Sequence, residues 1–420
     1  MGCRRNEKSM KAVVFALGCK VNSCESASLM TGLNELGYQT SDELGFADLY
    51  IINTCAVTAE AEKKSRQTVA RVKKFNPNAK IIVTGCASQK SPQDFLKKEG
   101  VTLVTGTNSK DKIINCLETC GNIVWEDAEY YEKYIPTNPD KTRAYVKVQD
   151  GCNNFCSYCI IPYLRGRSRS RQPEKVLEEL NVLSPVEAVI TGINLSAYNY
   201  ENIGLKGLID RLSEADCRIR LGSLEVGVIT EEFLLSLKNL KNFAPHFHLS
   251  LQSGSNAVLK SMNRKYTREE YLSRCELIKK HFPNCAITTD VIVGYSTETE
   301  SDFLDSMDLC KRVGFADIHC FPYSKREGTV GAKLKELPPS VKDQRMDEIL
   351  ALKKELKSNF INANLGKVLE VVPEDKEGEY VVGYTENYIK VYLSRSPEKK
   401  IVKVKLLSAF LEGALAEIVD

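Results

Sequence analysis

Apolar residues recur along this chain with three different periods, and each period occupies its own stretch. In the first third, continuous apolar runs alternate with helix-like stretches. Strands are predicted at 11–19, 47–55, 80–86 and 100–105, and helices at 26–36, 59–75 and 91–99. Continuous apolar strands separated by helices are typical of a parallel sheet that is covered on both faces. We therefore expect an α/β domain over residues 9–124.

The middle of the chain repeats this alternation after a polar stretch, Trp125–Arg143, which reads as a linker. Strands are predicted at 144–149, 187–191, 218–225, 246–251, 286–293 and 315–321, and the clearest helices at 173–183, 267–281 and 301–313. Six such units predict a partial (β/α)6 barrel over residues 140–337. Barrels of this kind place their chemistry at the carboxyl ends of the strands.

The last part of the chain changes period from helical to alternating. Residues 338–364 carry apolar side chains at helical spacing and predict a connecting helix. Period-two strands follow at 367–372, 380–385, 388–393, 401–406 and 415–419. Five short strands predict a small β-barrel over 365–420, a shape that often binds oligonucleotides. The fold class is therefore α/β with a C-terminal β-barrel.

Composition narrows the setting of the protein. The 420 residues are 43% apolar and 27% charged, with a net charge of +3, so nucleic-acid affinity must come from local patches. No apolar run reaches membrane-spanning length, and the polar start Met1–Lys11 lacks a secretory pattern, so we expect a cytoplasmic protein without a membrane partner. Fifteen cysteines in a reducing compartment favour metal ligation over disulfides, although Cys3 is expected to be incidental.

Three cysteines, Cys152, Cys156 and Cys159, form a Cys-x3-Cys-x2-Cys loop directly after a predicted strand. A closed zinc site or an electron-carrier cluster needs four ligands. Three thiolates hold three corners of a [4Fe–4S] cluster and leave its fourth iron open for S-adenosylmethionine (SAM). The alternative is three structural or redox cysteines that happen to be close.

Three more cysteines, Cys19, Cys55 and Cys86, each end a predicted apolar strand of the first domain. Parallel strands end at one edge of a sheet, where ligands bind. Their convergence predicts a second [4Fe–4S] cluster with three protein ligands. The alternative is buried, half-apolar cysteines, since cysteine is among the most buried residue types. We assign that alternative to Cys24, Cys116 and Cys120.

Polar residues and glycine near predicted strand ends of the barrel are candidates for SAM contacts: Gly192, Asn194, Glu225, Gln252 and Asp290. Gly192 would let the backbone approach the methionyl amine, with Asn194 at the edge of the site. Glu225 would accept from a ribose or a cation, Gln252 would bond a hydroxyl, and Asp290 would line the barrel mouth. Ordinary turns, caps and surface carboxylates are the alternatives. His246 and His248 share one strand face and are expected to be polar core residues.

Two sets of residues are candidates for RNA contacts. The densest basic run follows the cysteine loop and contains Arg165, Arg167, Arg169 and Arg171. Guanidinium groups suit phosphates, but a solvated charged turn is an equally good interpretation. In the C-terminal barrel, Tyr384, Tyr388 and Lys390 are candidates for base stacking and phosphate contact.

Several of these segments resemble the tRNA methylthiotransferases of the radical-SAM superfamily: Leu17–Asn22, Asn53–Cys55, Thr84–Cys86, Gln149–Cys159 and Gly383–Tyr388. The resemblance covers essentially the whole chain, including a C-terminal barrel of the TRAM type. Lys20 and Val21 resemble the subgroup that acts on N6-threonylcarbamoyladenosine, since the isopentenyladenosine subgroup usually has Gln-Met there. Two segments, Gly222–Val226 and Ser296–Thr299, depart from the family's usual residues.

The resemblance implies that Cys152, Cys156 and Cys159 hold the SAM cluster. It implies that Cys19, Cys55 and Cys86 hold an auxiliary, sulfur-carrying cluster, so the expected cofactors are two [4Fe–4S] clusters and SAM. It assigns no catalytic side chain beyond the cluster ligands. The implied reaction transfers a methylthio group to C2 of N6-threonylcarbamoyladenosine at position 37 of tRNA. The implied partners are tRNA, a flavodoxin- or ferredoxin-type electron donor and a sulfur source.

Three alternatives stay open. The substrate of the same chemistry could be isopentenyladenosine in tRNA, or it could be a ribosomal-protein side chain. In a different class, the chain could be an RNA-binding protein whose cysteines hold zinc or electron-transfer clusters. The missing fourth cysteine of the loop argues against that last class.

Overall fold

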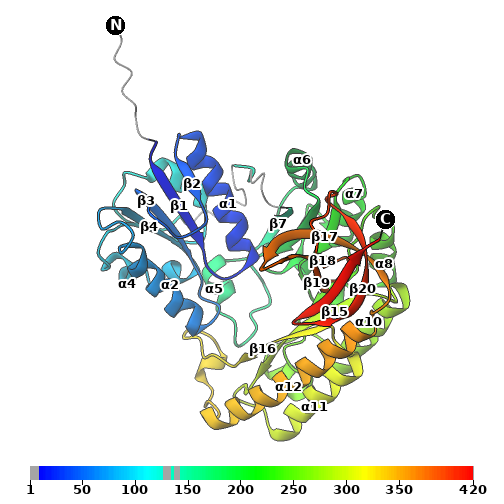
Figure 1. The fold of residues 1–420 in the computed structure, drawn as a ribbon. Helices are drawn as coiled ribbons and strands as arrows, with labels where there is room; N and C mark the ends of the chain where they lie inside the picture. Colours follow the sequence, from blue (N-terminus) through cyan, green and yellow to red (C-terminus); the bar gives the residue numbers. More distant parts are fainter. Residues whose placement is uncertain (1–8, 126–133, 137–141, 420) are drawn as a thin grey trace. The chain divides into compact units, whose positions relative to one another are not determined.

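The computed structural model describes residues 9–125, 134–136 and 142–419 (Figure 1). Cys3 and most of the predicted linker 125–143 lie outside the described residues. Contacts divide the chain into two compact units. Unit 1 comprises Met1–Asn138, Asp150–Asn153 and Cys159–Arg167, and unit 2 comprises Pro139–Gln149, Asn154–Tyr158 and Ser168–Asp420.

Unit 1 is built on a six-stranded parallel sheet with the order β2-β1-β3-β4-β5-β6. Its strands are β1 (Lys11–Ala16), β2 (Gln39–Ser41), β3 (Leu49–Thr54), β4 (Lys80–Gly85), β5 (Val101–Thr105) and β6 (Gly121–Ile123). Four of these were predicted. The two edge strands, β2 and β6, are only three residues long and carry no apolar run, so the sequence pattern did not predict them.

Helices cover both faces of this sheet (Figure 1). On one face lie α1 (Lys20–Glu35) and the 3-10 helix η1 (Lys110–Cys116). On the other lie α2 (Ala59–Val72), α3 (Cys86–Lys90), α4 (Pro92–Leu96) and α5 (Ile161–Arg165). The predicted helix start at Ser26 was wrong. Helix α1 begins six residues earlier, directly after Cys19, and its first two turns bury the polar residues Asn22 and Glu25.

Unit 2 contains the strands of the predicted barrel in two four-stranded sheets, β12-β9-β7-β8 and β13-β14-β15-β16. The strands are β7 (Arg143–Asp150), β8 (Arg169–Ser170), β9 (Glu187–Gly192), β12 (Arg218–Leu221), β13 (Ser223–Leu224), β14 (His246–Leu249), β15 (Ala286–Val293) and β16 (Asp317–Pro322). The predicted strand 218–225 is divided at Gly222, where an added Cβ would lie 3.1 Å from the Ile190 carbonyl oxygen. The other five predicted strands are each one continuous strand.

The helices of unit 2 are α6 (Pro173–Leu183), α7 (Leu205–Leu212), α8 (Glu231–Lys238), α9 (Asn256–Ser261), α10 (Arg268–His281), α11 (Glu300–Val313) and α12 (Pro339–Asn362). Six of them bury an apolar face against the strands in one core, whereas Val258 of α9 belongs to a separate small cluster with Tyr295 and Tyr323. Capping boxes start α10 at Thr267 and α11 at Thr299. The departure from the family pattern at Ser296–Thr299 therefore ends in a helix cap.

The C-terminal part of unit 2 is a closed barrel with the strand order β17-β18-β19-β21-β20. Its strands are β17 (Val368–Glu377), β18 (Tyr380–Thr385), β19 (Lys390–Leu393), β20 (Val402–Phe410) and β21 (Gly413–Ile418). This confirms the predicted small barrel and, with the two sheets above, the α/β fold class. Within the described residues, a search for a helix of sufficient length and apolarity to cross a membrane found none.

Candidate functional site

Three neighbouring strands of unit 1 bring Cys19, Cys55 and Cys86 to one edge of the sheet. Cys19 precedes α1, Cys55 follows β3, and Cys86 is the first residue of α3 after β4. The strand order β1-β3-β4 places their ends side by side. The pattern of apolar runs therefore predicted this placement, and we call the three cysteines the auxiliary site.

Two glycines allow the backbone to close around the auxiliary site. Gly18 has φ +91°, and an added Cβ would lie 2.4 Å from the Cys55 Sγ atom. Gly85 has φ +103°, and an added Cβ would lie 2.4 Å from the Thr54 carbonyl oxygen. Only glycine fits either position without moving the neighbouring backbone or the cysteine.

Burial makes Cys55 and Cys86 poor thiolates until positive charge approaches them. Cys55 and Cys86 are each 3% exposed. Burial raises the pKa of the Cys55 thiol to about 12. Burial also raises the pKa of Cys86, although the nearby Arg165 and Lys110 oppose that change. A cationic metal centre would stabilise all three as thiolates.

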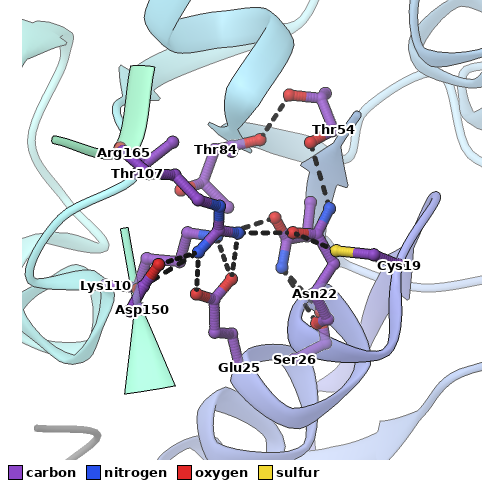
Figure 2. A network of polar contacts seen from close by, with 12 residues as sticks. Cys19, Asn22, Glu25, Ser26, Thr54, Thr84, Thr107, Lys110, Asp150 and Arg165 are labelled. Atoms are coloured by element: carbon purple, nitrogen blue, oxygen red, sulfur yellow. Dashed lines mark hydrogen bonds and ion pairs between the residues drawn. The ribbon is translucent and has the colours of Figure 1, made fainter. Parts of the chain in front are cut away.

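Four charged side chains of unit 1 are buried, and Figure 2 shows them in one network of polar contacts with Cys19. We call them the charged quartet: Glu25, Lys110, Asp150 and Arg165. Arg165 Nη1 donates to Glu25 Oε1 at 2.8 Å and to Asp150 Oδ1 at 3.0 Å, and Lys110 pairs with Glu25. Burial lowers the pKa of Lys110, and its pairing with Glu25 opposes that shift. The quartet holds two positive and two negative groups, so it is formally neutral.

Two asparagines connect the quartet to the backbone of the auxiliary site. Arg165 Nη2 donates to Asn22 Oδ1 at 2.8 Å, and Lys110 Nζ donates to Asn53 Oδ1 at 2.9 Å. Asn22 Nδ2 in turn donates to the carbonyl oxygens of Leu17 at 2.7 Å and Thr54 at 3.1 Å. These carbonyls lie just before Cys19 and Cys55, so the network fixes the backbone that carries both thiols.

The chemistry of this donor set fits an iron–sulfur cluster better than a single ion. No group of three or more Cys, His, Asp or Glu side chains within the described ranges is arranged to hold one metal ion. A cubane cluster differs because each thiolate binds its own iron, so the sulfur atoms need not converge on one point. A cluster held by three thiolates carries negative charge. The auxiliary site suits it, because it has buried thiols, a backbone lined by glycine and nearby cationic side chains.

The cysteine loop is divided between the two units. In unit 1, the Cys152 amide donates to the Gly166 carbonyl oxygen at 3.1 Å. In unit 2, Arg264 Nη1 lies 3.4 Å from Cys156 Sγ and 3.0 Å from Glu225 Oε1. Asn154 Nδ2 also donates to Glu225 Oε1 at 2.7 Å. Glu225 thus orients the arginine beside Cys156, a partner that the sequence analysis did not foresee.

The predicted SAM residues of unit 2 fall into small groups near strand ends. An added Cβ on Gly192 would lie 2.9 Å from Gln149 Oε1. That same oxygen accepts from the Asn194 backbone amide at 2.7 Å. Gln252 has φ +71°, and its backbone amide donates to the Asp290 backbone carbonyl oxygen at 2.8 Å. Gln149 therefore contacts both Gly192 and Asn194, while a backbone hydrogen bond joins Gln252 to Asp290.

Asp290 belongs to a cluster of titratable side chains. Its Oδ2 atom lies 3.1 Å from His248 Nε2, and His248 Nδ1 lies 3.0 Å from Thr288 Oγ1. Burial would raise the pKa of Asp290, but the hydrogen bond and charge of His248 hold it below its ordinary value. His246 Nε2 also bonds Thr288 Oγ1, at 2.8 Å. The two histidines have polar partners on β15, as expected for polar core residues.

The four arginines of the basic run have different environments. Arg165 is 0% exposed in the quartet, and Arg171 is buried in an ion pair with Glu179. Neither guanidinium is at a surface where RNA phosphate could reach it, which corrects the prediction for these two. Arg167 is exposed and Arg169 is half-buried. Only this second pair keeps the predicted accessibility.

The C-terminal candidates also differ in accessibility. Tyr388 stacks on His246 with ring centroids 4.3 Å apart, and Arg220 lies 4.9 Å over the Tyr388 ring. Tyr384 stacks on Tyr388 at 4.8 Å. Both tyrosines are half-buried and already stacked, which weakens their assignment to RNA bases. Lys390 lies 2.7 Å from Glu377 Oε1.

Sequence reasoning missed several residues that organise these sites. They are Asn22, Glu25, Asn53, Lys110, Gln149 and Arg264. Asn22, Asn53 and Gln149 stand inside the segments quoted above for their resemblance, a signal that was available. Glu25, Lys110 and Arg264 look like ordinary surface charges in the sequence.

Comparison with known proteins gives two family matches. The Radical SAM superfamily matches residues 146–310, and Uncharacterized protein family UPF0004 matches residues 11–106. Among solved structures, the radical S-adenosylmethionine methyltransferase TsrM from Kitasatospora setae has a TM-score of 0.56 at 12% identity. That likeness covers 74% of this chain and 73% of TsrM and concerns the fold alone.

Curated relatives match nearly the full length. The threonylcarbamoyladenosine tRNA methylthiotransferase MtaB of Bacillus subtilis is 38% identical, over 98% of each chain. MtaB of Aquifex aeolicus is 35% identical over 91% of this chain and 96% of its own length. A tRNA-2-methylthio-N(6)-dimethylallyladenosine synthase from Thermoanaerobacter is 35% identical, over 88% and 86%. Radical-SAM membership implies a [4Fe–4S] cluster and SAM as cofactors. The chain belongs to the tRNA methylthiotransferase family of the radical-SAM superfamily.

Proposed function

We propose that this protein transfers a methylthio group to C2 of N6-threonylcarbamoyladenosine at position 37 of tRNA. The observation that carries the proposal is the gathering of Cys19, Cys55 and Cys86 at one sheet edge, in a chain that also carries the loop Cys152–Cys159. The N6-threonylcarbamoyl preference rests on Lys20 and Val21 and on the 38% identity to the B. subtilis protein of that name.

In this proposal each residue set has its own task. The loop cysteines hold the SAM cluster, and the auxiliary site holds the second cluster. When bound, the clusters and SAM supply the one-electron chemistry and the sulfur that an unactivated C2–H bond requires. Gly192 lacks a Cβ where Gln149 packs against it, and Gln149 Oε1 accepts from the Asn194 backbone amide. This stretch of backbone is the proposed contact for the methionyl amine of SAM. Arg264 orients Cys156, while Gln252 and Asp290 remain proposed SAM contacts.

RNA binding is proposed for the accessible part of the predicted set, namely Arg167, Arg169 and Lys390, with Tyr384 and Tyr388 in a lesser role. The two arginines and the half-buried Lys390 would contact phosphates and position the substrate. A flavodoxin- or ferredoxin-type donor and a sulfur source are the proposed partners, and the cytoplasm is the proposed location.

Mass spectrometry of tRNA nucleosides tests this proposal directly. In a strain without the protein, we expect 2-methylthio-N6-threonylcarbamoyladenosine to disappear and N6-threonylcarbamoyladenosine to accumulate. Restoring the wild-type gene should reverse both changes, and a Cys156→Ala gene should not. Loss of the 2-methylthio dimethylallyl nucleoside instead would overturn the substrate assignment. An unchanged tRNA profile would point to a protein substrate.

The dimethylallyl alternative is supported by its own observation, because a synthase of that nucleoside is 35% identical over 88% of this chain. Reconstituted enzyme should therefore be offered both unmethylthiolated tRNAs in competition. The proposal expects preferential conversion of the threonylcarbamoyl substrate.

A further inference from the structure

The charged quartet of unit 1 joins three separate parts of the chain. Glu25 lies on α1, six residues after Cys19, and Lys110 begins η1. Asp150 stands two residues before Cys152, and Arg165 six residues after Cys159. The ion pairs therefore connect the auxiliary site to both flanks of the cysteine loop.

Arg165 is the central member of the quartet. Its Nη1 atom contacts Glu25 Oε1 and Asp150 Oδ1, and its Nη2 atom contacts Glu25 Oε2 at 3.2 Å. A planar guanidinium uses its fixed fork of donors here, and a lysine could not reproduce the same contacts. One buried side chain thus bonds the helix that follows Cys19 and the residue that leads into Cys152.

Backbone contacts within unit 1 hold the two flanks together. Gly151 has φ +68°, and an added Cβ would lie 2.0 Å from the Arg167 carbonyl oxygen. The Asp150 carboxylate accepts from the Gly151 amide at 2.7 Å. Thr107 Oγ1 donates to the Leu164 carbonyl oxygen at 2.7 Å, which adds a contact from the segment that precedes Lys110. The segments that carry Cys152 and Cys159 are therefore fixed on unit 1.

The quartet also sets the charge around the auxiliary site. Lys110 and Arg165 are close enough to Cys86 to influence its thiol electrostatically. Glu25 and Asp150 offset these cations, and all four side chains are buried. In such a low-dielectric place, removing one charge leaves the others uncompensated.

We propose that the charged quartet is a positioning network that fixes the cysteine-loop flanks of unit 1 on the auxiliary site and sets the reduction potential of the cluster held there. The inference rests on the proposed function for the presence of that cluster. The members of the charged quartet act through the cluster ligands and do not touch the substrate. The reduction potential of a cluster responds to nearby charge, so the direction of the shift in potential is defined for each substitution.

The test is a redox titration, followed by electron paramagnetic resonance, of full-length reconstituted protein. It is repeated with Cys156→Ala to isolate the auxiliary signal. Glu25→Gln removes a negative charge and should shift the potential of the auxiliary cluster upward. Lys110→Met removes a positive charge and should shift it downward. The double variant should return close to the wild-type potential, a cancellation that general structural damage does not produce.

A matched control uses an ion pair at the other end of the same sheet. Lys80 opens β4 and pairs with Glu118 at 2.7 Å. Lys80→Met and Glu118→Gln should leave the potential unchanged. Shifts of one sign in both quartet variants, or no shift with full iron content, would overturn the inference. If the wild-type chain takes up no second cluster, the proposed function fails instead.

Hydrogen exchange tests the positioning part separately. Glu25→Gln should increase amide exchange in residues 150–153 and 159–167, although the substitution lies on α1. Glu118→Gln should not. Unchanged exchange in those segments would show that the quartet does not hold the loop flanks. Should Glu25→Gln fail to fold, Asp150→Asn carries the same charge change and the same expected upward shift.

Discussion

Units 1 and 2 bury charged side chains at opposite ends of their parallel strands. In unit 1, the network of the auxiliary site includes the uncharged Asn53 near the end of β3 and the charged Asp150, which ends β7 but belongs to unit 1. In unit 2, Arg143, Glu187 and Arg218 are the first residues of β7, β9 and β12, and they lie in register. The carboxyl ends thus carry the candidate chemistry, and the amino ends carry a different network.

Glu187 is the centre of the unit 2 network. Its fully buried carboxylate lies 2.6 Å from Arg143 Nε, 2.7 Å from Arg218 Nε and 2.8 Å from Arg220 Nε. Arg220 also donates to the carbonyl oxygens of Thr385 and Glu386, at 3.1 and 3.2 Å. Three arginines around one glutamate therefore join the strands of the partial barrel to the C-terminal barrel.

The comparison teaches that buried charge has a different meaning at each end of a parallel strand. At the amino ends, charge stabilises the assembly, as in other α/β barrels. At the carboxyl ends it surrounds the residues that bind cofactor. Glu187 and Glu25 are both buried and both paired with arginine, yet only Glu25 lies beside candidate cluster ligands.

The largest expected effect comes from removing one ligand of the auxiliary site. Cys55→Ala should lower the iron content from about eight to about four per chain after reconstitution and abolish methylthio transfer. Reductive SAM cleavage should continue, because the loop cysteines are intact. Cys24→Ala is the matched control, since Cys24 is a buried cysteine of α1 that lies outside the auxiliary site. Equal iron loss in both variants would contradict the assignment.

The next effect concerns stability, and it should separate the two networks. Glu187→Gln leaves the buried Arg218 and Arg220 without their carboxylate and should lower the free energy of unfolding by about 3 kcal/mol. The iron content should stay unchanged. The cluster potentials should also stay unchanged, whereas Glu25→Gln should shift the potential of the auxiliary cluster. Urea unfolding of both variants measures the first effect, and the redox titration measures the second. A changed potential in Glu187→Gln would break the distinction between strand ends.

The pH dependence of this loss has a defined sign. Burial alone would raise the pKa of Glu187, but Arg220, Arg143 and Arg218 hold it at about 2, below its ordinary 4.5. A depressed pKa means that ionised Glu187 stabilises the fold above about pH 4.5, and that this contribution is lost as the pH falls toward 2. The stability difference between wild type and Glu187→Gln should therefore shrink over that range.

The cysteines could be predicted from sequence because their positions depend on local pattern. An apolar run marks a strand, and the residue after it marks the sheet edge, so Cys19, Cys55 and Cys86 could be placed together. The small barrel followed in the same way from period-two alternation. The helix start at Lys20 could not, because the first turn of α1 buries polar residues.

The buried networks could not be predicted because their partners are distant in sequence. Lys110 is 85 residues from Glu25, and Arg165 is 140 residues from it. Each looks like a solvated surface charge until tertiary structure buries it. The prediction of RNA contact for Arg165 fails for this reason. Arg171 pairs with Glu179, only eight residues away, but a basic run does not show which of its members turn inward.

A smaller effect should come from the aromatic contact between the two parts of unit 2. Tyr388 contacts both His246 and Arg220, so Tyr388→Leu should lower the free energy of unfolding by about 1–2 kcal/mol. Phe46→Leu is the control, because Phe46 is 61% exposed and should change stability by less than about 0.5 kcal/mol. Urea unfolding compares them. Strong loss of tRNA affinity without loss of stability would restore Tyr388 as an RNA contact.

The smallest effect should appear on the outer face of the C-terminal barrel. Lys390 is neutralised by Glu377, whose two carboxylate oxygens lie 2.7 and 2.8 Å from its Nζ atom. Lys390→Ala should therefore weaken tRNA binding only about twofold, or about 0.5 kcal/mol. Glu377→Gln frees the lysine and should strengthen binding by a similar factor, with a steeper salt dependence. Filter binding at several salt concentrations measures both. If both variants weaken tRNA binding, the intact ion pair between Lys390 and Glu377 is what matters. Its role is then to stabilise the barrel, as the Glu187 network stabilises unit 2, and not to contact phosphate.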